Sequence, residues 1–386
     1  MTQEPNIFPY IARLLQGAEV VWTTLGDEKK IEIANANRRP VKASERISGN
    51  IPYYGANNIQ DYVEGYTHEG TYILIAEDGT KSIENYSVQW AIGKFWANNH
   101  VHVLRGKNNV DSRFIYYYLQ TVNFVPFLTG GDRAKLTKAK LLEIQIPLPP
   151  LSVQQEIVRI LDKFTQLEAE LEAELDCRKR QYEYYRNKLL SYKENEVEWK
   201  TLGEVACFQN GKGHEQSIDE NGAFIVVNSK FISTDGGIKK YCDEQIVPLF
   251  KDDILIVMSD LPNGKALAKT FLVKENNKYT LNQRIGRITI KDTSKLLSIF
   301  VNYYINRTRQ LTKYDNGTDQ TNLKKDQILS VQIPLPPLSE QQRIATILDK
   351  FDTLVNSISE GLPKEIALRR KQYEYYREQL LSFPKG

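Results

Sequence analysis

The stretch that decides the fold is IQIPLPPLS (residues 144–152), because it recurs as VQIPLPPLS (residues 331–339) with only its first residue changed. The two copies start 187 residues apart, and the same offset aligns Leu136 with Leu323. A repeat of this kind indicates a chain built from two related halves with an internal two-fold relation. Such a chain suits a partner that has two-fold symmetry of its own, and double-stranded DNA is the leading candidate.

A second repeated motif lies upstream, where WTTLG (residues 22–26) matches WKTLG (residues 199–203). Each motif follows a Leu-Leu pair and a short polar link, so residues 1–17 resemble the end of a repeat helix. We therefore expect the two ends of the chain to lie near each other. Between the repeated motifs, short strands, turn signals and short helices near residues 111–123 and 295–310 predict two mixed α/β globules.

The helical segments after both proline-rich copies carry a coiled-coil pattern. Ser152 can cap the first helix, and apolar residues follow at spacings of four and three from Val153 to Leu171. The second copy carries four extra residues around Gly361 and Pro363, which predicts a kink or short break. Proline also starts helices stiffly, so we interpret both proline segments as structural rather than as ligands for a partner.

Each helical segment has roughly forty residues, and at about 1.5 Å per residue it would be about 60 Å long. Two such helices would separate the globules by more than one turn of B-DNA, about 34 Å, so both could reach the major groove on one side of a duplex. The alternative is that the helices form a dimerisation seam.

A basic and aromatic run occurs in both helical segments and is predicted to dock a partner protein. The alternative is a solvated face with tyrosines on the seam. The predicted partner-binding residues are Arg178, Lys179, Tyr182, Tyr184, Tyr185, Arg370, Lys371, Tyr373, Tyr375 and Tyr376.

The bulk composition fits an ordinary globular protein of two or three domains. The chain has 386 residues and 41% hydrophobic content, and its longest apolar runs have strand length. The N-terminus lacks an export signal, so we expect a cytoplasmic protein. With 51 Lys and Arg against 48 Asp and Glu, the net charge of +3 neither requires nor excludes a polyanionic partner.

The sequence predicts neither a metal site nor disulfides. The three cysteines lie far apart and lack the paired spacing of a zinc site, and the four histidines form no ligand cluster. These residues are Cys177, Cys207, Cys242, His68, His100, His102 and His214.

Taken together, the twin PLPPLS helix segments, the Trp-x-x-Leu-Gly entries, and the phrases ILIAEDG (residues 73–79) and FWANNH (residues 95–100) are highly specific. With them the chain resembles, over nearly its whole length, the specificity subunit of type I restriction-modification systems. The resemblance implies two target recognition domains, each reading half of a bipartite DNA sequence. It also implies paired helices that recruit two modification (methyltransferase) subunits and, through them, restriction (translocase and nuclease) subunits.

The predicted fold class is α+β: two mixed α/β recognition domains separated by two long antiparallel coiled-coil helices, with an internal pseudo-two-fold repeat. The predicted domains are an N-terminal stub (1–17), recognition domain 1 (18–146), a central helical spacer (147–194), recognition domain 2 (195–333) and a C-terminal helical spacer (334–386).

No catalytic residues are predicted, because the chain lacks a phosphate-binding Gly-rich loop and an adenine methylase motif. We expect no cofactor in this chain, since the resemblance places S-adenosylmethionine, ATP and Mg on the partner subunits. Two alternatives stay open. One is a coiled-coil scaffold without DNA readout, and the other is a variant restriction enzyme with a cryptic active site.

Sequence readout needs amide and guanidinium groups at the rims of the globules, because Asn and Gln pair with adenine while Arg and Lys pair with guanine or phosphate. Each candidate taken singly could also be an ordinary loop residue. In the first globule the candidates are Tyr54, Asn57, Asn58, Lys81, Asn98, Asn99, His100, Arg133 and Lys135. In the second they are Lys212, Asn228, Lys230, Asn263, Lys265, Asn282, Gln283, Arg284, Gln320, Asn322 and Lys324.

Overall fold

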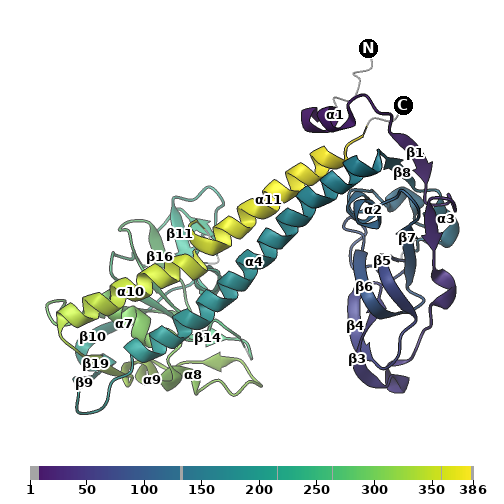
Figure 1. Cartoon of the computed structure of the whole chain (residues 1–386). Helices are drawn as coiled ribbons and strands as arrows, with labels where there is room; N and C mark the ends of the chain where they lie inside the picture. Colours follow the sequence, from purple (N-terminus) through teal and green to yellow (C-terminus); the bar gives the residue numbers. More distant parts are fainter. Residues whose placement is uncertain (1–7, 131–133, 215, 263, 358, 384–386) are drawn as a thin grey trace. The chain divides into compact units, whose positions relative to one another are not determined.

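The structure is a computed structural model that describes residues 8–130, 134–214, 216–262, 264–357 and 359–383. Its contacts divide the chain into unit 1, residues 1–169 with 368–386, and unit 2, residues 170–367. The division cuts through both predicted helical spacers, so each unit combines one globule with part of each helical segment (Figure 1). The predicted α+β class and the internal repeat are confirmed.

Unit 1 is built on a six-stranded sheet in the order β2-β7-β5-β6-β3-β4. Strand β5 lies antiparallel to both of its neighbours, and β3 runs parallel to β6. Helix α2 packs on the sheet, and the Asp111 carboxylate caps that helix by accepting hydrogen bonds from two of its backbone N–H groups. The elements are α1 (Pro9–Leu15), β1 (Val21–Thr24), β2 (Ile31–Ile33), η1 (Asn35–Asn37), η2 (Ala43–Glu45), β3 (Ser48–Gly55), β4 (Asn58–Val63), β5 (His68–Ala76), β6 (Val88–Ala97), β7 (Val101–Gly106), α2 (Ser112–Leu119), η3 (Val125–Phe127), α3 (Lys138–Leu142) and β8 (Gln145–Leu148).

Unit 2 contains a four-stranded sheet, β10-β17-β13-β15, and a three-stranded sheet, β12-β11-β16. All four residues of β13 are buried, because a core cluster lies on each side of that strand. The elements are β9 (Glu198–Thr201), α5 (Leu202–Val205), β10 (Ala206–Asn210), β11 (Phe224–Val227), α6 (Ser229–Ser233), β12 (Tyr241–Cys242), β13 (Ile254–Val257), β14 (Ser259–Asp260), β15 (Thr270–Leu272), β16 (Tyr279–Leu281), β17 (Ile285–Ile290), α7 (Ser298–Ile305), α8 (Arg309–Thr312), β18 (Thr321–Asn322), α9 (Lys325–Leu329) and β19 (Gln332–Leu335).

The repeated motifs form the same two-stranded frame in each unit. In unit 1, β1 pairs with β8 and sets Trp22 opposite Pro147. In unit 2, β9 pairs with β19 and sets Trp199 opposite Pro334. Each proline segment thus ends a strand and leads into a helix, as the structural interpretation of these prolines predicts.

A buried glutamine fastens each long helix to its own globule. The Gln154 side chain accepts a hydrogen bond from Asp111 N (2.8 Å) and donates to the carbonyl oxygens of Pro149 (2.8 Å) and Asn109 (3.3 Å). The Gln341 side chain forms the corresponding set with Leu297 N (2.9 Å), Pro336 O (2.8 Å) and Lys295 O (2.9 Å). These contacts account for the first glutamine of the QQ pair that follows each proline segment.

The first helical segment is one helix, α4 (Leu151–Leu189), of 39 residues. The second is divided into α10 (Leu338–Asn356) and α11 (Gly361–Leu381), so the predicted break is confirmed. Gly361 has φ +74°, and a Cβ there would lie 2.5 Å from the Thr353 carbonyl oxygen, so this position requires glycine. The predicted cap at Ser152 is wrong, because α4 already begins at Leu151.

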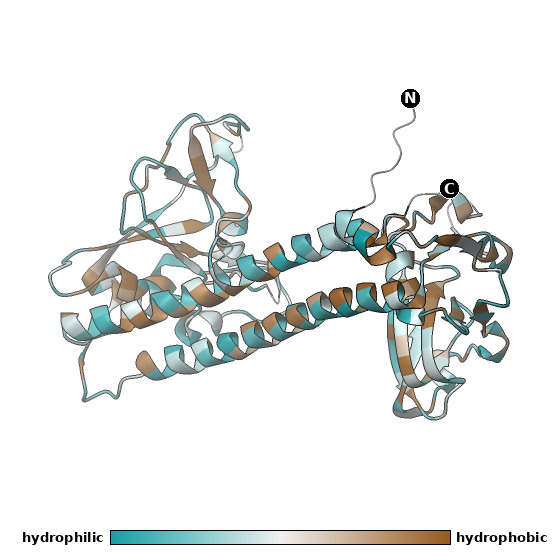
Figure 2. Cartoon of the chain, turned by 45° about the horizontal axis from the view of Figure 1, so that its top comes forward, coloured by the Kyte–Doolittle hydropathy of each residue, from teal (hydrophilic) through white to brown (hydrophobic). Residues whose placement is uncertain are grey.

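The apolar seam between the two helical segments contains the same set of aromatic contacts twice. In one set the phenylalanine comes from the first segment, and in the other it comes from the second. In unit 1, Phe164 of α4 packs against Tyr373 and Tyr376 of α11. In unit 2, Phe351 of α10 packs against Tyr182 and Tyr185 of α4. Figure 2 shows hydrophobic and hydrophilic residues alternating along these helices, as an apolar seam requires.

Both ends of the described chain contribute to the core of unit 1. Ile11 and Leu15 of α1 share a hydrophobic cluster with Leu380 and Leu381 of α11. The Tyr10 hydroxyl donates a hydrogen bond of 2.8 Å to Glu156 of α4. The first and last described segments, α1 and the end of α11, therefore lie together, as the predicted proximity of the two ends requires.

Candidate nucleic-acid interface

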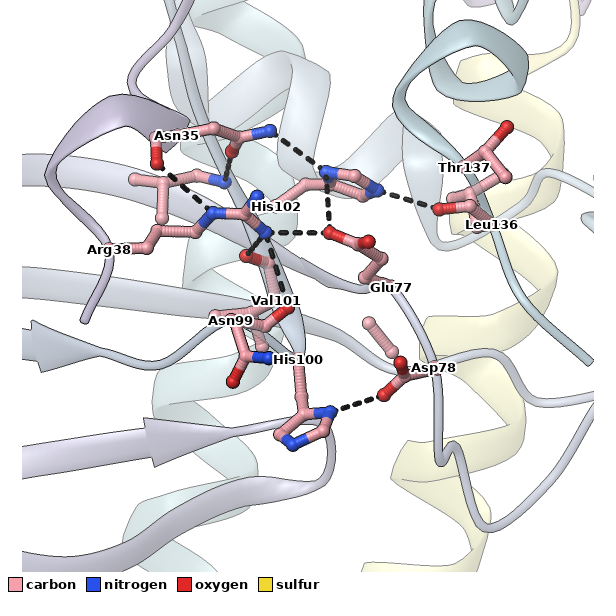
Figure 3. Close-up of polar contacts among 12 residues, drawn as sticks. Asn35, Arg38, Glu77, Asp78, Asn99, His100, Val101, His102, Leu136 and Thr137 are labelled. Atoms are coloured by element: carbon pink, nitrogen blue, oxygen red, sulfur yellow. Dashed lines mark hydrogen bonds and ion pairs between the residues drawn. The ribbon is translucent and has the colours of Figure 1, made fainter. Parts of the chain in front are cut away.

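In unit 1 the loops at one end of the sheet bring together four separate segments. They are the turn at Asn57, the loop that follows β5 at Glu77, the turn between β6 and β7, and the segment at Lys135. We call this group of loops the polar end of unit 1. Figure 3 shows its central contacts.

The carboxylate of Glu77 organises the polar end. It accepts a hydrogen bond of 2.7 Å from Arg38 Nη1 and forms an ion pair of 3.0 Å with Lys135 Nζ. Burial alone would raise the pKa of Glu77, but the hydrogen bonds from Arg38 and Lys135 outweigh it and hold the pKa below its ordinary value. Glu77 is therefore a stable anion that fixes two cations.

Behind Glu77 lies His102, which is fully buried. Its Nε2–H donates to the Leu136 carbonyl oxygen (2.7 Å), and its Nδ1 accepts from the Asn35 side chain (3.0 Å). Burial lowers the pKa of His102, in keeping with this neutral tautomer. The histidine thus holds the segment with Lys135 against the sheet.

The exposed side chains of the polar end form its rim. There, the carboxylate of Asp78 and the imidazole of His100 are in direct contact. His100 Nδ1 forms a short hydrogen bond with Asp78 Oδ1, and the two side chains are 49% and 34% exposed. An accessible carboxylate can accept from cytosine or adenine amino groups, and an imidazole can contact a guanine edge or a phosphate. The pair therefore presents chemistry suited to base edges.

The structure brings most of the predicted residues of unit 1 to this end, but several have structural roles. The Asn57 side chain bridges Gly79 O (2.7 Å) and Lys81 N (2.8 Å) and so shapes the loop that carries Lys81. Asn99, His100 and Lys81 are exposed, and Asn58 is exposed with φ +99°. Arg133 lies outside the described residues.

Two predicted residues of unit 1 need correction. Tyr54 is 8% exposed and Asn98 is 3% exposed. The Asn98 side chain accepts the His100 backbone N–H (2.8 Å), so it sets the turn that presents His100. Such burial argues against direct DNA contact by either residue, and we assign both to the support of the rim.

Sequence reasoning missed Arg38, Glu77, Asp78 and His102. Two of them, Glu77 and Asp78, lie in ILIAEDG (residues 73–79), which entered the prediction only as a turn signal and a family motif. Acidic residues were not among the candidates, because the prediction selected amide and cationic side chains. Their role here, however, is to position cations and donors.

Unit 2 has a corresponding polar end with different chemistry. Leu323 N donates to Met258 O (2.7 Å), as Leu136 N donates to Glu77 O (2.7 Å), so Met258 occupies the backbone position of Glu77. Beside it, the Gln320 amide donates to Ser259 Oγ (2.7 Å), and Asn322 lies opposite Ser259 in the strand pair. Amides and hydroxyls replace the ionic cluster of unit 1.

The neighbouring loops of unit 2 bring further predicted residues to the same end. Met258 N donates to Arg284 O (2.9 Å), and Gln283 N donates to Lys212 O (2.9 Å). Arg284, Gln283 and Lys212 are exposed, and Asn282 is half-buried. The loop with exposed Lys265 is closed by Asp260, whose side chain was also missed and accepts from Ala266 N and Leu267 N.

The remaining predicted residues of unit 2 are Asn228, Lys230, Asn263 and Lys324. The Asn228 side chain accepts from Phe231 N (2.9 Å) and so caps α6, which is the ordinary role of asparagine at a helix start. Lys230 and Lys324 are exposed. Asn263 lies outside the described residues.

The predicted partner-binding run divides into seam and surface residues. Tyr182, Tyr185, Tyr373 and Tyr376 make the ring contacts of the seam, so their principal role lies within each unit. The surface group contains the 60% exposed Tyr184 and the 55% exposed Tyr375, together with Lys179 and Lys371, and with Arg178 and Arg370, which form ion pairs with Glu174 and Glu168. The surface group remains the predicted docking surface.

The sequence matches a family model twice. The model describes the type I restriction modification DNA specificity domain and covers residues 23–176 and 194–368. The two matches fall on the two copies of the repeat and together cover most of the chain. The chain therefore belongs to the type I restriction-modification DNA specificity family.

Individual relatives agree with this assignment. The chain is 46% identical, over 97% of its own length and 98% of the relative's, to a putative type I restriction enzyme specificity subunit from Haemophilus influenzae. It is 35% identical, over 97% of both chains, to a type I restriction enzyme specificity subunit from Escherichia coli. The crystal structure of a type I restriction-modification S subunit from M. genitalium shares the fold, with a TM-score of 0.62 at 16% identity, over 96% of this chain and 98% of that one.

No helix in the described ranges is both long and apolar enough to span a membrane. Within the same ranges, no group of three or more His, Cys, Asp or Glu side chains is arranged to hold a metal ion.

Proposed function

We propose that this chain is the sequence-reading subunit of a type I restriction-modification complex and that each polar end reads one half of a bipartite DNA target. One observation carries the proposal: the repeat keeps the same backbone frame in both units but places different polar side chains on it. The contacts from Leu136 to Glu77 and from Leu323 to Met258 are equivalent, while the first end is ionic and the second is built from amides. Two readers with one frame and different chemistry suit a target whose halves differ in sequence.

The partners that we propose are double-stranded DNA, two modification (methyltransferase) subunits and, through them, the restriction subunits. The exposed part of the basic and aromatic run, with Tyr184 and Tyr375, is the docking surface that we propose for the modification subunits. The chain itself is proposed to be non-catalytic and cytoplasmic. S-adenosylmethionine, ATP and Mg would be bound by the partner subunits.

A domain exchange tests the proposal. Residues 199–332 are replaced by the equivalent segment of another family member, and the complex with modification subunits is expressed in a host whose methylated sites are sequenced. We expect one half of the methylated target to change and the other half to stay. An unchanged target, or a change in both halves, would contradict the division of readout between the units.

Two further measurements separate the alternatives. If the chain were a scaffold without DNA readout, the assembled complex would shift no duplex from a random pool in an electrophoretic assay. If the chain held a cryptic active site, the purified subunit alone would cut or methylate DNA when cofactors are added. We expect a shift by the complex and no reaction by the isolated chain.

A further inference from the structure

Unit 2 contains an open pocket of about 390 Å³ that is lined by none of the predicted DNA-reading residues. It lies where the end of α4 meets β9 and the loop between α7 and α8. Its lining includes three arginines and two aromatic residues with polar atoms, namely Arg186, Arg307, Arg309, Tyr192 and Trp199. The predicted readout of DNA does not use any of them.

Three donors of this lining are buried without a hydrogen-bond partner. They are Arg186 Nε, Tyr192 Oη and Trp199 Nε1. In the described ranges six buried side-chain atoms lack a partner, and half of these six belong to this one pocket. A buried donor left unpaired is destabilising, so a cluster of such donors points to an acceptor that binds there.

The charges of the pocket are also uncompensated. Arg186 Nη2 donates to Tyr303 O (3.1 Å) and Asn306 O, but among the described residues Arg186 forms no ion pair with a carboxylate. Burial lowers the pKa of Arg186, and the nearby cation Arg307 lowers it further, while Glu183 acts in the opposite direction. Arg309 is exposed, and within the described part of the chain it likewise forms no ion pair. An anion in the pocket would stabilise all three guanidinium groups.

The repeat supplies an internal comparison, because unit 1 has neutral residues at the positions equivalent to Arg307 and Arg309 and a phenylalanine at that of Tyr192, while Arg377 and Trp22 retain the types of Arg186 and Trp199. Tyr117 and Tyr303 are equivalent through their contacts with Asp162 and Asp349. The same alignment places Thr121 and Asn123 of unit 1 where unit 2 has Arg307 and Arg309, and the repeated Leu-Leu pair places Phe383 where unit 2 has Tyr192. Phe383 packs in the apolar core of unit 1, so the set of three arginines beside a tyrosine hydroxyl is a feature of unit 2.

We propose that this pocket of unit 2 binds a phosphate group through Arg186, Arg307 and Arg309, with the Tyr192 hydroxyl and the Trp199 indole N–H as further donors. The five donors favour a compact polyvalent oxyanion over a single carboxylate, because phosphate offers more acceptor oxygens. The phosphate could belong to a small free ligand or to the DNA backbone. The proposal goes beyond the readout of DNA bases and does not depend on it.

The test is a calorimetric titration of the full chain with inorganic phosphate, and with acetate, at constant pH and ionic strength. We expect saturable binding of phosphate, about tenfold weaker in Arg309→Gln and severalfold weaker in Tyr192→Phe, which copies the residue of unit 1. The matched control is Lys313→Gln, which removes the same charge four residues from Arg309 but outside the pocket lining, and its affinity should stay within about twofold of the parent.

Three results would overturn the proposal: no saturable binding of phosphate, equal binding of acetate, or equal weakening in Arg309→Gln and Lys313→Gln. A second arm adds duplex DNA and identifies the source of the phosphate. Displacement of inorganic phosphate by the duplex, together with a smaller salt dependence in Arg309→Gln, supports a DNA phosphate as the natural occupant. Simultaneous binding of both supports a free ligand.

Discussion

The polar ends of the two units share a backbone frame and differ in how they hold their side chains. In unit 1 a carboxylate, Glu77, binds Arg38 and Lys135, and a buried histidine supports it. In unit 2 the same backbone position is Met258, and hydrogen bonds among neutral groups around Gln320 take the place of the ion pairs. The comparison teaches that the repeat preserves where loops are fastened while leaving the chemistry of each rim free to diverge.

The largest predicted effect concerns the part that the two units share. Gln154→Ala and Gln341→Ala each remove one buried and two partly buried hydrogen bonds to backbone groups. We expect each variant to lower the opening free energy of its own unit by about 3 kcal/mol, measured by hydrogen exchange of that unit's core strands. The exposed neighbour Gln342→Ala should change it by less than about 0.5 kcal/mol. Clearly unequal losses of opening free energy in the two units would contradict a common frame.

The second prediction concerns the part in which the units differ. Glu77→Gln removes the charge that holds Arg38 and Lys135, and we expect unit 1 to lose about 2 kcal/mol. Met258→Leu in unit 2 should cost less than about 1.5 kcal/mol, because the volume is nearly conserved and no charge is involved. Urea unfolding followed by hydrogen exchange measures both. A smaller loss in Glu77→Gln than in Met258→Leu would contradict the role of the ion cluster.

The repeat and its frame could be predicted from the sequence because they rest on identical residues at a fixed offset. The proline segments, the helix break at Gly361 and the approach of the chain ends follow from pattern alone. The cap at Ser152 failed because Pro150, rather than the serine, supplies the carbonyl that starts the helix. Local propensity gave no means to separate these two starting points.

The rims could be predicted only in outline. Sequence reasoning selects exposed Asn, Lys and Arg, but the accessibility of Asn98 and Tyr54 depends on strands that pair far along the chain. The partnership of Glu77 with Arg38 and Lys135 joins three segments that no spacing rule connects. Long-range pairing therefore decides which polar residues support the rim and which face outward.

The third prediction uses pH to separate the units. Burial lowers the pKa of His68 and His102, both in unit 1, below the ordinary 6.5. The unfolded chain then binds more protons, so the stability that these residues contribute is present above pH 6.5 and is lost as the pH falls below it. In unit 2, burial raises the pKa of Asp352 above 3.8, so its contribution has the opposite sign and falls as the pH rises.

The measurement is hydrogen exchange at pH 7.5 and pH 5.5, corrected for intrinsic rates. We expect β5 and β7 of unit 1 to lose protection on acidification and β13 of unit 2 to lose less. His102→Gln should reduce the loss in unit 1, because it removes one of the two titrating groups. Equal losses in both units, or a loss unaffected by His102→Gln, would contradict this assignment.

The smallest predicted effect concerns two lysines near the rims, and it rests on the proposed binding of DNA. Lys135 is already neutralised by Glu77, whereas Lys324 is exposed and forms no ion pair among the described residues. A lysine that neutralises a DNA phosphate contributes about 0.9 to the slope of log affinity against log salt. Lys324→Ala should therefore reduce that slope by about one in a titration of the assembled complex, and Lys135→Ala by less than about half as much. A larger reduction in Lys135→Ala would mean that DNA draws Lys135 away from Glu77, and the ion cluster would then be a switch opened by DNA rather than a fixed support.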